Sequence, residues 1–311
     1  MSFFVGDVSI ETYPMTTRTT QRNFLPTSTH EATMMRGNDD GGAGDVVVEE
    51  EEEEILVLFA SQTGNSEQAA QDIAQQIPHK LSPEGLEKLT GAAKSSCSIH
   101  KKLTARHMQL DDFLEIQEAP WTRLVVIVLS SYGVGQSPLG GYRFRDLCDH
   151  LLEQQEQQKD GASKMLDGMS FCLLGLGDSM YTTFLENPTT THDALVGAGA
   201  TLIGTFGKAD ASDDQLRLIA DWIDGMWPSL AAAVLAPPTP SSSSLQERLK
   251  QMQQDTMEIC YRINPDLKKE KKAVDSIYRN TFLTLFGSIL VAILAFLFHN
   301  QRLQQEQQQE L

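Results

Sequence analysis

Basic residues are scarce in this chain. Lys and Arg together number 25 of the 311 residues, against 42 Asp and Glu, and the formal net charge is −17. Neutralisation of phosphates supplies most of the non-specific affinity of nucleic-acid-binding proteins. The charge balance therefore argues against DNA and RNA as partners.

Cysteines are also few, and none of them forms a C-x-x-C pair. The four are Cys97, Cys148, Cys172 and Cys260. Neither a disulfide framework nor a thiolate zinc site is indicated, so we predict no metal site. A reducing compartment fits this usage best.

Familiar nucleotide-binding and catalytic signatures are missing as well. After the first predicted strand, the chain has neither G-x-x-x-x-G-K-[ST] nor G-x-G-x-x-G. No Ser/His/Asp constellation is suggested by position, and His107 and His192 are interpreted as surface or helix residues. We therefore predict no catalytic residue.

What the sequence does contain is an alternation of short apolar runs with longer helical patterns. Continuous apolarity implies strands buried on both faces, as in a parallel sheet. Five strands and intervening helices predict an α/β fold, a doubly wound sheet with right-handed crossovers. The predicted strands are residues 55–60, 124–130, 170–174 and 200–206, with a weaker one near 105–110, and the predicted helices are 67–77, 142–158, 192–196 with its flanks, and 214–233.

Composition divides the rest of the chain. The predicted parts are a disordered leader at 1–48, an α/β domain at 49–235, a linker or stalk at 236–280, an apolar span at 281–298 and a polar tail at 299–311. The acidic run at 49–54 is interpreted as a solvated charge run, with an interaction patch as the alternative. The long segment 78–104 is expected to hold a helical insertion around 83–93. Residues 245–263 are amphipathic, typical of either a stalk helix or a surface helix.

The apolar span at 281–298 has no formal charge and is about 27 Å long as a helix, enough to cross a thin bilayer. Five basic residues precede it and one follows it, which places the N-terminal domain in the cytosol. Only 13 residues follow the span (311 minus 298), which predicts a tail anchor. The expected location is the endoplasmic reticulum membrane, with the mitochondrial outer membrane as the alternative.

Three loops at one edge of the predicted sheet carry the chemistry. In doubly wound sheets, ligands bind outside the carboxyl ends of the strands. Ser61-Gln62-Thr63-Gly64-Asn65-Ser66, between a strand and a helix, is typical of a phosphate cradle at a helix N-terminus. The next two loops carry Tyr132 and Tyr181 beside glycines, and two tyrosines can sandwich a planar ring.

These motifs, in order, are S-Q-T-G-N-S-E, S-S-Y-G-V-G-Q-S-P, L-G-L-G-D-S-M-Y-T-T-F and G-K-A-D-A-S-D-D. Together they resemble the flavodoxin-like FMN domain of the diflavin reductases, over about residues 55–235. The resemblance implies a flavodoxin-like sheet and FMN as cofactor. It assigns cofactor binding to Ser61, Gln62, Thr63, Gly64, Asn65, Ser66, Ser131, Tyr132, Gly133, Gly135, Leu174, Gly175, Gly177, Asp178, Tyr181, Phe184 and Asp210.

The sequence departs from this family in the loop after the third strand. Family members usually carry acids there, followed by Asn, where this chain has Val134, Gln136 and Gly140. Acids near the ring disfavour negative charge on reduced flavin, so their loss is expected to make reduction easier. The loop's role in docking partners is affected too. Family members also have Asn about two residues after Phe184, where this chain has Glu186.

Only 76 residues follow Leu235 (311 minus 235), too few for an FAD- or NADPH-binding module. The sequence thus predicts a membrane-anchored FMN protein that passes single electrons from a separate FAD/NADPH-dependent reductase to an unidentified acceptor. The alternative is a tethered flavodoxin-fold adaptor without flavin. A third hypothesis, a flavin enzyme that reduces a quinone with NAD(P)H, is disfavoured because the motifs resemble those of electron carriers.

Overall fold

The computed structural model describes residues 51–91, 101–115, 121–155, 164–237 and 242–267, together with 269 and 272. The predicted leader, the apolar span at 281–298 and the polar tail lie outside the described residues, as does Cys97.

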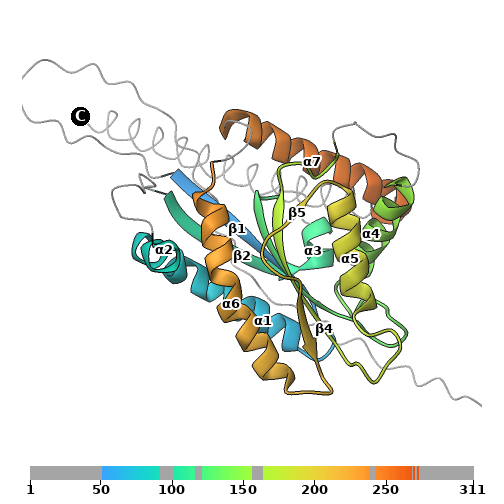
Figure 1. The fold of residues 1–311 in the computed structure, drawn as a ribbon. Helices are drawn as coiled ribbons and strands as arrows, with labels where there is room; N and C mark the ends of the chain where they lie inside the picture. Colours follow the sequence, from blue (N-terminus) through green and yellow to red (C-terminus); the bar gives the residue numbers. More distant parts are fainter. Residues whose placement is uncertain are drawn as a thin grey trace, which may run out of the picture. The chain divides into compact units, whose positions relative to one another are not determined.

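A parallel sheet organises the described chain (Figure 1). Its strands are β1 (Glu51–Ala60), β2 (Lys101–Gln109), β3 (Leu124–Ser130), β4 (Ser170–Gly177), β5 (Thr201–Leu202) and β6 (Gly207–Asp210). Neighbours pair in the order β2-β1-β3-β4-β5, and β6 also pairs with β4. This is the flavodoxin-like order of doubly wound sheets, and it confirms the predicted fold class.

The central strands are buried on both faces, as their continuous apolarity predicts. In β1, Ile55, Val57 and Phe59 join one hydrophobic core, whereas Leu56 and Leu58 join the other. Successive side chains point to opposite faces of a strand, so a run without polar residues requires cover on both sides.

Helices provide that cover. One core contains residues of α1 (Asn65–Lys80), α2 (Pro83–Thr90) and α6 (Gln215–Leu235). The other contains residues of α3 (Leu110–Glu115), α4 (Tyr142–Gln155), α5 (Glu186–Gly197) and α7 (Ser242–Ile263). The four predicted helices and the predicted helical insertion are confirmed, with shifted ends; α3 was not predicted.

The predicted fifth strand at 200–206 is wrong in detail. Two short pieces, β5 and β6, fill the fifth position, and both pair with β4. Between them the chain leaves the sheet at Gly204, whose φ is +71°. Left-handed backbone of this kind is easy for glycine and interrupts a strand.

Part of the acidic run differs from the solvated interpretation, whereas Glu52 is exposed as expected and Glu49 and Glu50 lie outside the described residues. Glu52, Glu53 and Glu54 lie in β1, and each forms an ion pair, with Lys102, Arg123 and Arg106 respectively, at 2.5–2.7 Å. The pair between Glu53 and Arg123 is largely shielded from solvent, with 15% and 11% of the side chains exposed. Arg123 also donates to the Ala233 carbonyl oxygen at 2.8 Å, which ties the end of α6 to β1 and β3.

The domain does not end at Leu235, contrary to the predicted boundary. Part of the predicted linker or stalk is α7, and this helix packs on the sheet domain rather than standing apart. Met252 and Thr256 are fully buried, and Trp121 Nε1 donates to Thr256 Oγ1 at 2.9 Å. The amphipathic pattern of 245–263 therefore belongs to a core-covering helix.

Among the described helices, only α6 is long and apolar enough, by length and composition, to cross a membrane. Its Trp227 and Leu230 are buried in the hydrophobic core beside the sheet. The predicted span at 281–298 stays a prediction.

Shortening a buried side chain of α7 tests whether this helix belongs to the domain. Met252→Ala is expected to lower the free energy of unfolding by about 2 to 5 kcal/mol, because it removes buried methylenes and leaves a cavity. Urea denaturation of a fragment covering residues 49–270 measures the change. Lys250→Ala, on an exposed position of the same helix, is the control. Equal unfolding midpoints for the two variants would contradict the packing of α7.

Candidate functional site

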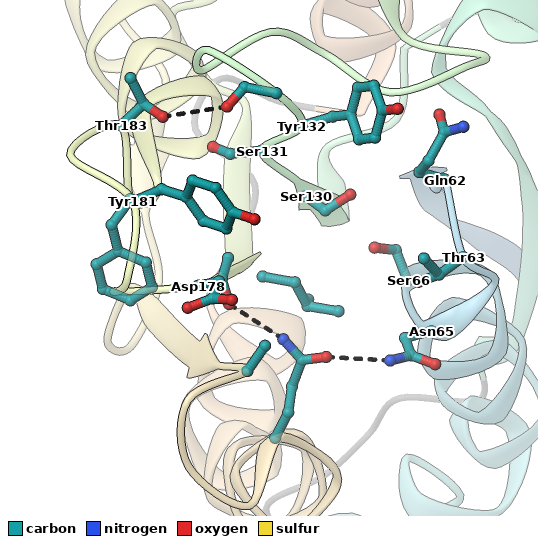
Figure 2. Close-up of a pocket in the computed structure, with 16 residues that line it drawn as sticks. Gln62, Thr63, Asn65, Ser66, Ser130, Ser131, Tyr132, Asp178, Tyr181 and Thr183 are labelled. Atoms are coloured by element: carbon teal, nitrogen blue, oxygen red, sulfur yellow. Dashed lines mark hydrogen bonds between the residues drawn. The ribbon is translucent and has the colours of Figure 1, made fainter.

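The loops that follow β1, β3 and β4 meet the start of α6 around a cavity of about 630 Å³ (Figure 2). Its position is at the carboxyl ends of parallel strands, where β2 and β3 lie on opposite sides of β1 and the strand order reverses. The lining residues are Gln62, Thr63, Asn65, Ser66, Ser130, Ser131, Tyr132, Gly133, Leu176, Gly177, Asp178, Tyr181, Thr183, Phe184, Ala211 and Gln215.

The N-terminus of α1 faces this cavity without a side-chain cap. Its N-cap residue is Gly64, in left-handed backbone with φ of 97°, and no side chain caps the helix. Unpaired N–H groups at a helix start, together with the helix dipole, favour an anion. Ser61, although predicted to bind directly, lies outside the lining; its Oγ accepts from the Gly64 N–H at 2.9 Å and shapes the loop.

Ser66 adds a second sign that this end of the cavity suits an anion. The residue is 1% exposed and lines the cavity, and its Oγ has no hydrogen-bond partner within the part of the chain that the structure describes. A buried hydroxyl left unpaired is unfavourable unless a ligand supplies the partner.

Tyr132 and Tyr181 enter the cavity wall from two different loops (Figure 2). Both rings are partly open to solvent, at 49% and 62% exposure. The loops are joined by the Thr183 hydroxyl, which donates to the Gly133 carbonyl oxygen at 3.4 Å. Both tyrosines thus line one cavity together with the hydroxyl and amide side chains of the first loop.

A small hairpin presents Tyr132. The backbone N–H groups of Tyr132 and Gln136 each donate to the other's carbonyl oxygen at 2.9 Å. Gly133 and Gly135 have φ of +56° and +87°, which glycine adopts most easily. Gly135 was predicted to bind the cofactor, but it lines a neighbouring hollow instead; a Cβ there would lie 2.3 Å from Glu186 Oε2.

Two further predicted residues lie outside the cavity lining because they stand before the carboxyl end of β4. Leu174 is fully buried in the core on the α1 and α6 side. Gly175 points to the opposite face, where an added Cβ would lie 2.7 Å from Pro188 Cβ on α5. Gly175 therefore permits close helix packing. The next two residues, Leu176 and Gly177, reach the cavity.

Gln215 is the functional residue that sequence reasoning missed most clearly. Its Oε1 accepts from Asn65 Nδ2 at 3.0 Å, and its Nε2 donates to the carbonyl oxygens of Gly177 and Ala209 at 3.3 and 3.1 Å. One amide thus connects the start of α1 to the ends of β4 and β6, beside the cavity that Gln215 lines. Ser130, Leu176, Thr183 and Ala211 were missed too; each adjoins or lies within a predicted motif.

An asparagine, Asn187, stands one position after the place where the family asparagine was expected. Asn187 is 1% exposed, and its Nδ2 donates to the Ser130 carbonyl oxygen at 3.0 Å. Its backbone N–H donates to Ser131 Oγ at 3.1 Å. Asn187 thereby fixes the end of β3 against the start of α5, whereas Glu186 lies at the neighbouring hollow.

Asp178 lines the cavity, whereas Asp210 supports it from outside. Asp210 Oδ1 accepts from the N–H groups of Ser179 and Ser212, at 2.9 Å each, and so joins the β4 loop to the β6 loop. Hydrogen bonds, first that from the Ser179 side chain, lower the pKa of the Asp210 carboxyl from 3.8 to about 2.

Part of the chain is similar in sequence to known proteins. Residues 90–222 match the sequence model of the family described as Flavodoxin. The chain is 29% identical over 181 residues to methionine synthase reductase of Caenorhabditis elegans, covering 57% of this chain and 22% of that protein. It is 28% identical over 190 residues to the sulfite reductase [NADPH] flavoprotein alpha-component of Thiocapsa roseopersicina, covering 59% and 30%.

The chain thus spans less than a third of the length of these two relatives. Among solved structures, it is similar to the flavodoxin of Streptococcus pneumonia TIGR4, with a TM-score of 0.36 and 20% identity, covering 58% of this chain and 99% of that one.

The hydrogen bonds to Asp210 predict its titration. Since the folded-state pKa is depressed, the stability that ionised Asp210 contributes is full above pH 3.8 and is lost as the pH falls from 3.8 to about 2. Carboxyl ¹³C NMR should show Asp210 titrating at about 2, and Ser179→Ala should raise this pKa towards 3.8. Thr189→Ala, on exposed α5 surface, should leave it at about 2. An unchanged Asp210 pKa in Ser179→Ala would overturn the assignment.

Proposed function

We propose that this chain, whose flavodoxin-like domain resembles the FMN domain of the diflavin reductases, is a membrane-anchored carrier of single electrons. The domain binds FMN. The donor in this proposal is a separate NAD(P)H-dependent flavin reductase, and the acceptor is a membrane-bound or soluble redox protein.

The observation that carries the proposal is the pairing of an uncapped helix start with two tyrosines at one cavity. The N-terminus of α1 and the unpaired Ser66 hydroxyl suit a phosphate. Tyr132 and Tyr181 suit a planar ring. A ligand with one phosphate and one planar ring system, as FMN has, fits both ends of this site, and the volume of about 630 Å³ lies in the usual range for cofactor pockets.

Bound FMN supplies one-electron transfer, and the residues of the chain hold the site in place. Gln215 fixes the relative positions of the α1 start and the β4 end. Thr183 joins the two tyrosine loops. Both tyrosines stay partly exposed, so the ring end of the site lies near the molecular surface, where another redox protein can approach it.

A separate electron donor is part of the proposal, and the relative named as an NADPH-dependent flavoprotein indicates the class of protein that would supply the electrons. The described residues form one α/β domain around the site just described. We assign the collection of hydride from NAD(P)H to another protein.

The proposed location is a membrane with the α/β domain in the cytosol. Support comes from the uncharged apolar run at 281–298 and from the basic residues before it. The endoplasmic reticulum is the membrane we favour, with the mitochondrial outer membrane as the alternative.

FMN binding is tested by the absorbance of purified protein after gel filtration with added FMN. The wild type should retain flavin bands. Tyr132→Ala/Tyr181→Ala should weaken FMN binding about 5- to 150-fold, because two ring contacts of about 0.5 to 1.5 kcal/mol each are lost. Tyr142→Ala is a matched control, since this exposed tyrosine lies outside the cavity lining. A folded wild type that stays colourless in excess FMN would leave the tethered adaptor as the better account.

Membrane anchoring is tested by flotation of the full chain with liposomes. The wild type should float with the lipid, whereas Leu290→Arg/Ile293→Arg should remain at the bottom of the gradient. An arginine near the centre of a spanning helix costs about 2.5 to 3.5 kcal/mol on insertion scales. Gln304→Arg, beyond the predicted span, is the control. Flotation of the double-arginine variant at the wild-type level would reject the span.

A further inference from the structure

Helix α7 begins at the edge of the sheet where the strands begin, which we call the amino edge. Near the start of the helix, the Arg248 guanidinium donates to the carbonyl oxygens of Met165 and Asp167 at 3.5 Å each. Both carbonyls stand just before β4. Farther along α7, Thr256 Oγ1 accepts from Trp121 Nε1 at 2.9 Å, and Trp121 stands just before β3. The first half of α7 is therefore bound to segments of the amino edge.

The last turns of α7 lie near the opposite edge, which carries the cavity. Burial first, and then the charges of nearby Asp111 and Asp146, raise the pKa of the Cys260 thiol to about 12. Asp111 follows the end of β2, and its N–H donates at 2.9 Å to the carbonyl oxygen of Gly140, in the loop after β3. Asp146 lies in the first half of α4, which follows the same loop. α7 thus runs from the amino edge towards the cavity edge.

Packing fixes this path. Met252, Ile259, Cys260 and Leu267 belong to the hydrophobic core that also contains residues of α3 and α4. Leu267 is only 6% exposed, and among the described residues it is the last member of this core. The chain therefore leaves the core of the domain at the end of the helix that points to the cavity edge.

The connection from this exit to the predicted span is short. Thirteen residues, 268–280, lie between Leu267 and the span at 281–298. A flexible chain of that length has an average end-to-end distance of about 20 Å. The domain itself is longer: α6 reaches from Gln215 in the cavity wall to Leu235 near the amino edge, 21 residues or about 30 Å. The amino edge is thus the end of the domain farther from the point of attachment.

We infer that α7 holds the domain with its cavity edge towards the membrane, and that the electron acceptor is a protein embedded in the same membrane. This inference rests on the proposed anchor and electron-carrier function, and it narrows the acceptor from membrane-bound or soluble to membrane-bound. Confinement of both proteins to one membrane raises their effective concentration for each other.

The direction of α7 favours this acceptor over a soluble one. A soluble protein would reach the cavity most easily if the anchor were attached at the amino edge, because the cavity would then face the cytosol. The lipid itself is a poor occupant of the cavity edge, since Asp178, Asp213 and Asp214 lie there and anionic headgroups repel acids. The cavity edge is therefore expected to face the membrane without lying on the lipid.

The test measures energy transfer from a fluorophore on the full chain to rhodamine-labelled lipid in liposomes. The fluorophore is attached to Leu139→Cys, at the cavity edge, or to Ala232→Cys, near the amino edge, and both positions are exposed. Cys97→Ser removes one native thiol, and the three cysteines that the structure describes are buried. The label at Leu139→Cys should lie about 20 to 30 Å closer to the lipid, because the two positions are separated by nearly the length of α6.

Two insertions of equal length form a matched pair. About 30 Gly and Ser residues between Lys272 and Ala273 should largely remove the difference between the labels, because the domain can then turn freely on a long flexible chain. The same insertion between Pro240 and Ser241 should preserve the difference, since α7 and its exit remain joined to the span as before.

Electron transfer from the photoreduced, FMN-loaded protein gives the second readout. The acceptor is a ferrocenium group on a lipid headgroup, which takes up one electron and becomes ferrocene. The insertion after Lys272 should slow this transfer about fivefold, because effective concentration falls with the length of the connection. The insertion before Ser241 should leave it at the wild-type rate, and both variants should reduce soluble ferricyanide as the wild type does.

The possible outcomes separate this inference from the proposed function. Equal energy transfer from the two labels would overturn the orientation, as would greater transfer from Ala232→Cys, which would turn the cavity to the cytosol. A full chain that does not bind liposomes would reject the anchor and the orientation with it. A chain that shows the orientation but never binds FMN would reject the electron carrier and its acceptor, while the orientation would stand.

Discussion

The structure depends on one constraint: β1, β3 and β4 are parallel and buried on both faces. Parallel strands end at the same edge, so the loops that follow them must converge there whatever their sequences are. The chain places β2 on one side of β1 and β3 on the other, which opens a crevice at the reversal. The helix start, both tyrosines and the supporting amide of Gln215 share one cavity because the sheet brings their segments together.

The sequence predicted most reliably the parts whose structure depends on local pattern. β3 begins and ends where its apolar run does, and the helices begin near their expected residues. The misassigned parts depend on distant contacts. An amphipathic pattern shows that α7 has an apolar face, but only the contact between Trp121 and Thr256 shows which surface that face covers. In the same way, Gly204 permits the break between β5 and β6 without requiring it.

Single residues of the candidate site also divide into those that local pattern predicts and those that depend on distant contacts. Motif resemblance led to these loops, but only the last residues of β4 reach the carboxyl edge of the sheet, so Gly175 packs against α5 while Leu176 and Gly177 reach the cavity. Ser61 and Asp210 shape their loops through hydrogen bonds rather than lining the cavity. Gln215 was missed because its importance comes from bridging three segments that are adjacent only in the folded chain.

Several features of the sheet edge that carries the cavity would lower the stability of a protein that bound no ligand there. An uncapped helix start, the unpaired Ser66 hydroxyl and exposed Val134 and Met180 each forgo stabilisation that common substitutions would restore. Elsewhere in the described domain, Trp121 Nε1 and the largely shielded Arg123 are paired, although Trp227 Nε1 and the Gln253 amide are buried without a partner among the described residues and Val196 is exposed. The uncapped helix start and the unpaired Ser66 hydroxyl are explained most simply if a bound anion supplies their hydrogen-bond partner. The same side chains that weaken the isolated domain then supply the contacts on which its proposed function depends.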